Sequence, residues 1–179
     1  LIYLPGGVEL AEVILACFEI GAIAVPISTK ITGYECKNIT DEILPRVIIT
    51  NWKMMNSFAD YSYPRINIEE LLNSSGGCGL LKNEYVKNNE DVCAIILTSG
   101  TTGLPKGVRL TYQNFESSCN NWNDFLQFDS MDQFLCCLPL HHIGGLAVLI
   151  RALIYGFSIN LVSVFEPTSV FNTINRYPV

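Results

Sequence analysis

Thr98-Ser99-Gly100-Thr101-Thr102-Gly103-Leu104-Pro105-Lys106-Gly107 follows directly after the short apolar run Cys93–Leu97. That run has the length and composition of a buried strand, so the quoted stretch is expected to form the loop at its carboxyl end. Glycine lets the backbone turn tightly and brings its N–H groups close to a ligand. The hydroxyls add rotatable donors, and Lys106 adds one compact positive charge. This combination is typical of a loop that holds a polyphosphate.

The loop differs from the P-loop of many nucleotide-binding proteins. A P-loop needs a glycine, four residues and then Gly-Lys followed by Ser or Thr. Here Lys106 follows Pro105 and precedes Gly107, so the Gly-Lys pair is absent. The alternative interpretation of the stretch is a solvated turn, with Lys106 as an ordinary surface lysine.

A second stretch carries histidines and glycines: Leu138-Pro139-Leu140-His141-His142-Ile143-Gly144-Gly145-Leu146. The first stretch resembles the phosphate-binding signature of the adenylate-forming (AMP-binding) superfamily, which includes acyl-CoA synthetases, luciferases and peptide-synthetase adenylation domains. The second resembles the Pro-x-x-His motif of that superfamily, which lies beside the acyl pocket. In this alignment His142 is the family histidine, and His141 stands where an aromatic residue is more usual.

The resemblance implies an activity with two half-reactions. A carboxylate attacks the α-phosphorus of ATP to give an acyl-adenylate, and a thiol such as coenzyme A then displaces AMP. The implied cofactors are ATP, Mg²⁺ and coenzyme A, and no protein-held metal site is expected. The nucleotide-binding residues it implies are Thr98, Ser99, Gly100, Thr101, Thr102, Gly103 and Lys106. The catalytic and substrate-binding assignment falls on His142, and Gly144, Gly145 and Arg151 are further substrate-binding candidates.

Several of these residues keep an alternative structural interpretation. His142 either lines the acyl pocket or is satisfied inside the fold, and the two glycines equally fit a plain helix start. Arg151 lies in an apolar segment, and a buried arginine needs a partner. That partner is either a substrate carboxylate, which a guanidinium grips bidentately, or a carboxylate or carbonyl of the protein itself.

Within the superfamily, the stretch from Leu138 to Gly156 most resembles the o-succinylbenzoate–CoA ligases of menaquinone biosynthesis. Their substrate is an aromatic diacid, which would suit Arg151. The alternatives are a fatty acyl-CoA synthetase, an adenylation domain that loads a carrier-protein thiol, and a non-catalytic nucleotide-binding remnant. The expected partners are small molecules, with a second copy of the chain as an optional homodimer.

Composition limits the class of protein further. The 179 residues are 49% hydrophobic and 16% charged, which indicates a folded core, and the net charge of −6 argues against nucleic-acid binding. The seven cysteines form no C-x-x-C pair and no zinc-ligand spacing, so we expect free thiols in a reducing cytoplasm. The apolar residues 143–165 contain one charge, Arg151, and favour a buried helix and strand over a membrane span.

Alternating elements predict the fold class. A strand at 1–4, a helix at 8–20 capped by Gly21, and a strand at 22–26 form a β-α-β unit. We expect an α/β fold with a mainly parallel sheet flanked by helices on both faces. Further expected elements are a helix at 35–42, strands at 47–50, 108–112 and 133–138, and a helix capped by Asn114 that ends near Phe125.

The domain prediction follows from the resemblance, which covers the whole chain. Residues 1–179 are interpreted as a fragment of the large N-terminal AMP-binding domain, with a surface linker at about 73–91 and the carboxyl-terminal part of the enzyme absent. Such a fragment is expected to be inactive alone. If the strands before the two motifs are parallel neighbours, both motifs open onto one cleft. The adjacent side chains of His141 and His142 are expected to diverge.

Overall fold

The amino-terminal part of the chain builds a parallel sheet. The computed structural model describes residues 1–58, 62–73, 85–98 and 105–176. Strand β1 (Ile2–Tyr3) pairs in parallel with β2 (Ile48–Thr50), which pairs in parallel with β3 (Arg65–Asn67). The connection after β1 is helix α1 (Val8–Glu19), and Gly21, two residues beyond its end, has the positive φ of 71° that suits the predicted cap.

A short extended segment joins this sheet to the next pair of strands. Ile2 and Ala24 take part in parallel bridges, Ile2 with Pro26 and Ala24 with Ala94. The segment therefore lies between β1 and β4 (Val92–Thr98) and corresponds to the strand predicted at 22–26. Strand β4 pairs with β5 (Lys106–Thr111) in antiparallel fashion. The sheet is parallel up to β4 and ends in an antiparallel hairpin.

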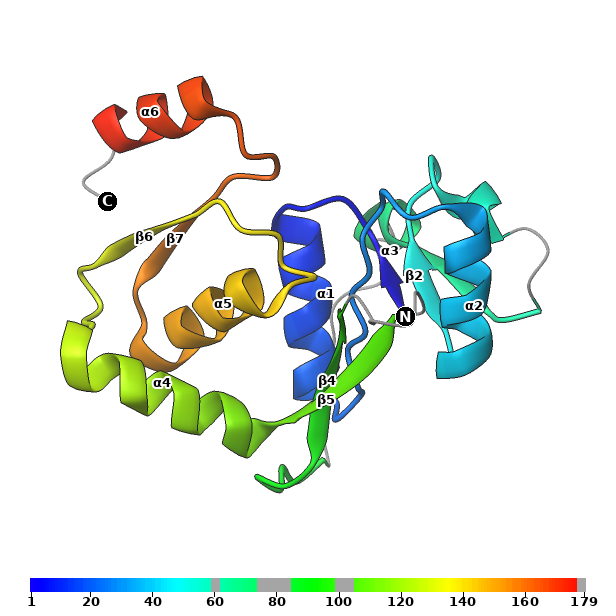
Figure 1. The fold of residues 1–179 in the computed structure, drawn as a ribbon, viewed down its shortest axis with the longest axis horizontal. Helices are drawn as coiled ribbons and strands as arrows, with labels where there is room; N and C mark the ends of the chain where they lie inside the picture. The colour runs from blue at the N-terminus through cyan, green and yellow to red at the C-terminus, as the bar shows by residue number, and fades with distance from the viewer. Residues whose placement is uncertain (59–61, 74–84, 99–104, 177–179) are drawn as a thin grey trace.

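Helices cover both faces of this sheet, as predicted. Ile2 and Leu4 point into a large core with α1, whereas Leu1 and Tyr3 point into a second core on the other face. That second core includes residues of α2 (Gly33–Ile43) and the short 3₁₀ helix η1 (Met55–Phe58). Figure 1 shows α1 and α2 on opposite sides of the strands. The remaining helix of this half is α3 (Ile68–Asn73).

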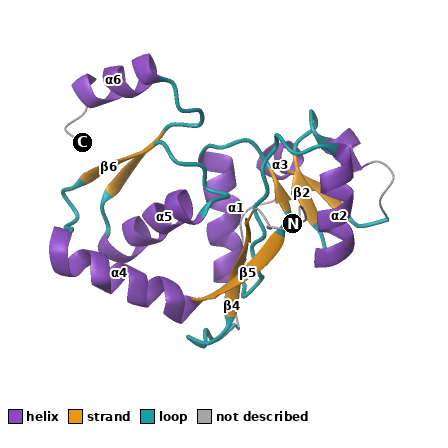
Figure 2. Cartoon of the chain, viewed as in Figure 1, coloured by secondary structure: helices purple, strands orange, loops and turns teal. Residues whose placement is uncertain are grey.

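The carboxyl-terminal half adds two more strands and three helices. Strand β6 (Gln133–Cys136) pairs in parallel with β7 (Ser158–Leu161), and α5 (Ile143–Tyr155) connects them. Helix α4 (Tyr112–Leu126) packs beside α5, and α6 (Pro167–Arg176) follows β7 (Figure 2). The segment 143–165 thus forms a helix and a strand, and no described helix is long and apolar enough to cross a membrane.

The start of α4 corrects one prediction. Thr111, and not Asn114, is the N-cap: its hydroxyl accepts a hydrogen bond from the Asn114 backbone N–H at 3.2 Å. The Asn114 side chain in turn accepts from the Thr111 N–H at 3.0 Å. This is a capping box, in which the N-cap residue and the third helical residue each accept a hydrogen bond from the other's backbone N–H. The sequence signal at Asn114 was real, but it was assigned to the wrong partner of the pair.

We expect Thr111→Ala to lower the free energy of unfolding by about 1 kcal/mol, because it leaves a helix N–H without its acceptor. Urea unfolding of the variant measures the loss. Ser117→Ala is the matched control, since it removes an exposed hydroxyl from the interior of the same helix and should be neutral or slightly stabilising. Equal losses in both variants would contradict the role of the cap.

Candidate active site

The predicted phosphate loop lies between β4 and β5, but most of it falls outside the described residues. Ser99, Gly100, Thr101, Thr102 and Gly103 belong to that undescribed stretch. The two ends of the loop are described. Thr98 is the last residue of β4, Lys106 is the first of β5, and the two are directly paired. The Thr98 hydroxyl donates to the Lys106 carbonyl oxygen at 3.3 Å. The hairpin therefore fixes both ends of the loop.

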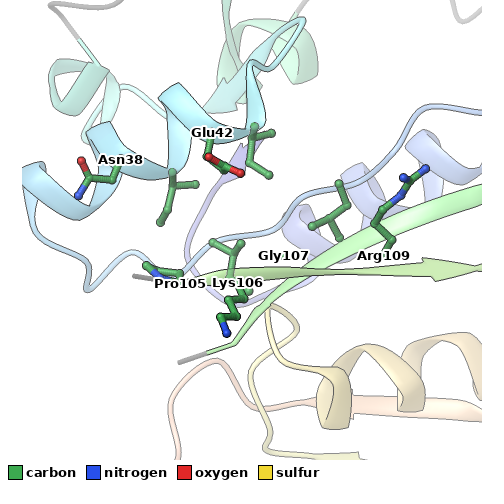
Figure 3. Close-up of a pocket in the computed structure, with 10 residues that line it drawn as sticks. Asn38, Glu42, Pro105, Lys106, Gly107 and Arg109 are labelled. Atoms are coloured by element: carbon green, nitrogen blue, oxygen red, sulfur yellow. The ribbon is translucent and has the colours of Figure 1, made fainter. Parts of the chain in front are cut away.

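Lys106 borders a cavity of about 360 Å³ between α2 and the hairpin. Asn38 and Glu42 face this cavity from α2, and Arg109 faces it from β5 (Figure 3). The Lys106 amino group extends away from α2 in that view. No hydrogen bond or ion pair of the amino group is found among the described residues, and Lys106 is exposed. Its charge is therefore available to a ligand.

A second, smaller cavity brings the two sequence motifs together. It has a volume of about 150 Å³, and Thr98, Pro105, His141 and His142 contribute to its wall. Strand β4 pairs with β5 and strand β6 pairs with β7, so the strands before the motifs are not hydrogen-bonded neighbours. The sequence predicted a shared cleft on the condition that these two strands are neighbours, and that condition is not met. The two motifs still meet, because the loops that follow the strands come together at the cavity.

His142 sits at the point where α5 begins. Its backbone N–H donates to the Pro139 carbonyl at 3.0 Å, and its carbonyl accepts from the Leu146 N–H at 3.0 Å. The residue is the N-cap of α5, but its side chain makes no capping hydrogen bond. The backbone is therefore fixed at both groups, while the exposed imidazole remains available at the cavity.

The two histidine side chains contact each other, and the expectation that they diverge is wrong. Their ring centroids lie 4.4 Å apart with an interplanar angle of 52°. The turn into α5 departs from a regular strand, so the alternation of side chains between two faces does not apply here. Burial, followed by the nearby His142 and Lys30, lowers the pKa of His141 to about 4. His141 is therefore neutral at pH 7.

Gly145 allows the first turn of α5 to approach the preceding loop closely. A Cβ atom at this position would lie 2.4 Å from the Pro139 carbonyl oxygen and 2.5 Å from that of Leu138. At Gly144 a Cβ would lie 2.9 Å from the Leu138 side chain, which can move more easily than backbone. The geometry favours a packing role for Gly145, one of the two interpretations that the sequence left open.

Arg151 lies two and a half turns further along α5, at the contact with α4. Its residue exposure is 7%, and its guanidinium carbon lies 4.5 Å from the centre of the Trp122 ring. Its Nε is buried without a hydrogen-bond partner, and Arg151 does not line the cavity of His142. Within the described part of the chain, the partner of Arg151 is therefore an aromatic ring. The sequence had suggested a carboxylate or a carbonyl instead. Burial lowers the pKa of Arg151.

The cavity also contains residues that sequence reasoning missed. Pro26, Ile27 and Ser28 contribute to its wall at the end of the segment that joins β1 to β4. The available signal was positional: they follow a predicted strand at its carboxyl end, as the two motifs do. Their side chains carry no distinctive chemistry, so nothing else marked them.

Comparison with known proteins identifies the family. Residues 1–179 match the family described as AMP-binding enzyme over the whole chain. The chain belongs to the AMP-binding enzyme family. A 2-succinylbenzoate–CoA ligase from Oceanobacillus iheyensis is 31% identical over 166 residues, which are 93% of this chain and 34% of that protein. The chain spans about a third of the length of the curated relatives it matches.

Solved structures agree with the family. The O-succinylbenzoate coenzyme A synthetase MenE from Bacillus subtilis, in complex with ATP and magnesium ion, superposes with a TM-score of 0.86 at 27% identity. That match covers 99% of this chain and 47% of the other. The same enzyme with the acyl-adenylate OSB-AMP gives a TM-score of 0.85 at 28% identity, over 98% of this chain and 46% of the other. The predicted fold class and superfamily are confirmed.

The described residues contain no metal-binding cluster and no disulfide. Within them, no group of three or more His, Cys, Asp or Glu side chains is placed to hold a metal ion. Six of the seven cysteines are described, and all six are free thiols. The predicted linker at 73–91 lies largely outside the described part, because 74–84 are not described.

We expect Gly145→Ala to lower the free energy of unfolding by about 1–3 kcal/mol, because the added methyl group would overlap backbone carbonyls. Denaturant unfolding measures the loss. Gly33→Ala is the matched control: it also adds a methyl group to the first turn of a helix, but nothing lies within 4 Å of that position. The control should be neutral or stabilising. An unchanged stability in Gly145→Ala would contradict the close approach.

The low pKa of His141 predicts a pH dependence of stability. The folded state holds His141 neutral down to a pKa of about 4, whereas the usual value is 6.5. Between these values the unfolded chain binds more protons, so the contribution of His141 is fully present above pH 6.5 and is lost as the pH falls toward 4. Unfolding of the wild type and His141→Phe, measured from pH 7.5 to 4.5, should show a steeper loss in the wild type. Parallel curves would contradict the shift.

Proposed function

We propose that the protein to which this chain belongs activates a carboxylic acid with ATP and transfers it to coenzyme A, with o-succinylbenzoate as the acid. The observation that carries this proposal is the cavity whose wall includes Thr98, at the start of the phosphate loop, and His142. The names of the relatives, 2-succinylbenzoate–CoA ligase and o-succinylbenzoate CoA synthetase, support the choice of acid. We assign the site to menaquinone biosynthesis on the same basis.

The proposed reaction divides into two displacements. In the first, a carboxylate oxygen attacks the α-phosphorus of ATP, the bond to the bridging oxygen breaks, and pyrophosphate leaves. In the second, the sulfur of coenzyme A attacks the acyl carbon, AMP leaves, and the thiol proton passes to solvent. The protein contributes mainly by positioning and by neutralising charge. In this proposal Lys106 supplies the positive charge, and the hydroxyls from Thr98 to Thr102 supply hydrogen-bond donors to the phosphates.

His142 is the residue we place next to the acid. Its imidazole lies at the cavity that begins at Thr98, so a carboxylate held there would be close to the nucleotide loop. We assign it the roles of binding and orienting the carboxylate. The Gly144–Gly145 turn holds the histidine at the start of α5, where the backbone N–H groups of the first turn also favour negative charge.

Arg151 is proposed to balance the second carboxylate of the diacid. Its burial and its unpaired Nε support this assignment, because a buried guanidinium without a carboxylate partner among the described residues retains an unmet donor. The Trp122 ring would then hold the guanidinium in place in the absence of substrate.

The cofactors follow from the same proposal. ATP and coenzyme A are substrates, and Mg²⁺ would accompany the nucleotide, where it neutralises phosphate charge. The described residues offer no cluster that would hold the ion without the nucleotide, so its protein ligands are assigned to none of them. Free thiols at all six described cysteines support a cytoplasmic location.

We expect Lys106→Ala to lower the rate of acyl-adenylate formation by about 100-fold or more, because it removes a charge that stabilises the transferring phosphate groups. The measurement is pyrophosphate release by the complete gene product with ATP, Mg²⁺ and o-succinylbenzoate, with and without coenzyme A. A panel of other carboxylic acids tests the choice of substrate.

Arg46→Ala is the control for charge, since it removes one exposed cation that lines neither cavity. It should retain wild-type activity. Pyrophosphate release that needs o-succinylbenzoate, and its conversion to the thioester with coenzyme A, would support the proposal. Activity with a different acid alone would correct the substrate, and silence from a folded protein would overturn the enzymatic assignment.

A further inference from the structure

We propose that His141 is a positioning residue whose ring holds the imidazole of His142 at the cavity. The proposal rests on the proposed function, because it assigns a role to His141 within the same site. It goes beyond that function by giving a task to a residue that the family alignment marks only as an unusual side chain. The geometry of the pair carries it.

The first step is that His142 has a fixed backbone and a side chain with few restraints. Its N–H and carbonyl are both hydrogen-bonded at 3.0 Å. Its imidazole makes no capping bond, and neither histidine ring has a hydrogen bond or ion pair recorded within the described part of the chain. The contact with the His141 ring, at 4.4 Å between centroids, is the specific interaction that restrains its orientation.

The second step concerns the position of His141 itself. Its ring is half-buried in the cavity wall among the apolar residues Ile27, Ile31 and Leu97, whereas His142 is exposed. A half-buried ring is held by its surroundings and can serve as a fixed support for a mobile neighbour. Aromatic rings prefer such tilted arrangements at this separation, so the contact favours one orientation of the His142 ring.

The third step is the charge of the pair. Two imidazolium rings at this distance would repel each other strongly. Burial, followed by the nearby His142 and Lys30, lowers the pKa of His141 and keeps it neutral at pH 7. Consequently His142 can approach a carboxylate without a positively charged neighbouring ring at its side. The supporting ring needs to be flat and uncharged, and a phenyl group meets both requirements.

The test compares His141→Phe with His141→Ala in the complete gene product. His141→Phe should retain kcat/KM for the acid within about threefold of the wild type, since the supporting ring is kept. His141→Ala should lower it by about 10- to 100-fold, as misplaced catalytic groups typically do. The affinity for ATP alone, measured by calorimetry, should stay within about twofold in both variants. A general folding defect would weaken ATP binding as well and thereby overturn the assignment.

A structural readout separates this proposal from the proposed function. Crystal structures of the wild type and both variants should show an ordered His142 ring at the cavity in the wild type and His141→Phe, and a rotated or disordered ring in His141→Ala. This result would support the positioning role even if no acid were activated. An unmoved ring in His141→Ala would overturn it, as would a His141→Phe enzyme as impaired as His141→Ala, because the imidazole nitrogens would then be required.

Discussion

Four backbone hydrogen bonds hold the segment from Ala24 to Ile27 between two strands, and the arrangement of the site depends on them. Toward β1, the Ile2 N–H donates to the Val25 carbonyl at 2.9 Å and the Ile27 N–H donates to the Ile2 carbonyl at 3.0 Å. Toward β4, the Ala24 N–H donates to Cys93 and the Ile95 N–H to Ala24, each at 2.9 Å. Without this segment the parallel sheet and the β4–β5 hairpin would be separate units.

The same segment determines what surrounds the phosphate loop. Ile27 and Ser28 leave the sheet at the level where Thr98 ends β4, so they enclose the small cavity on one side. The start of α5 encloses it on another, because Gly145 lets the helix approach the Pro139 carbonyl. Backbone contacts therefore place His142, and side-chain contacts only orient it. This order explains how an exposed imidazole can still have a defined location.

The sequence predicted the local structure well because the deciding signals are local. The apolar periodicity of α1, the glycine after it and the apolar run before Thr98 all depend on neighbours within a few residues. Which strands pair is a different question, because pairing depends on residues far apart in the chain. The sequence therefore left the neighbour of β4 as a condition; β4 pairs with β5, and the two motifs still meet at one cavity.

In the candidate site, too, local features could be predicted from the sequence and long-range contacts could not. The residue types around Lys106 predicted a phosphate loop, whereas the acid-binding role of His142 was implied by the resemblance to the family. The contact between His141 and His142 could not be inferred, because a rule for regular strands does not hold in a turn. The partner of Arg151 was equally hidden: Trp122 lies 29 residues earlier, on a helix whose packing against α5 only the fold determines.

The net charge of the chain bears on how the proposed phosphate loop would hold its ligand. With a net charge of −6, the chain as a whole repels an anion such as ATP. Repulsion from charges more than about 8 Å away is largely screened at physiological ionic strength, whereas a hydrogen bond acts at contact. Lys106 is exposed where the loop meets β5. Its charge would therefore act at short range on a phosphate that reaches the loop. In the proposed site, the hydroxyls of the loop would supply the remaining donors without adding charge, so phosphate binding would depend on contacts at close range.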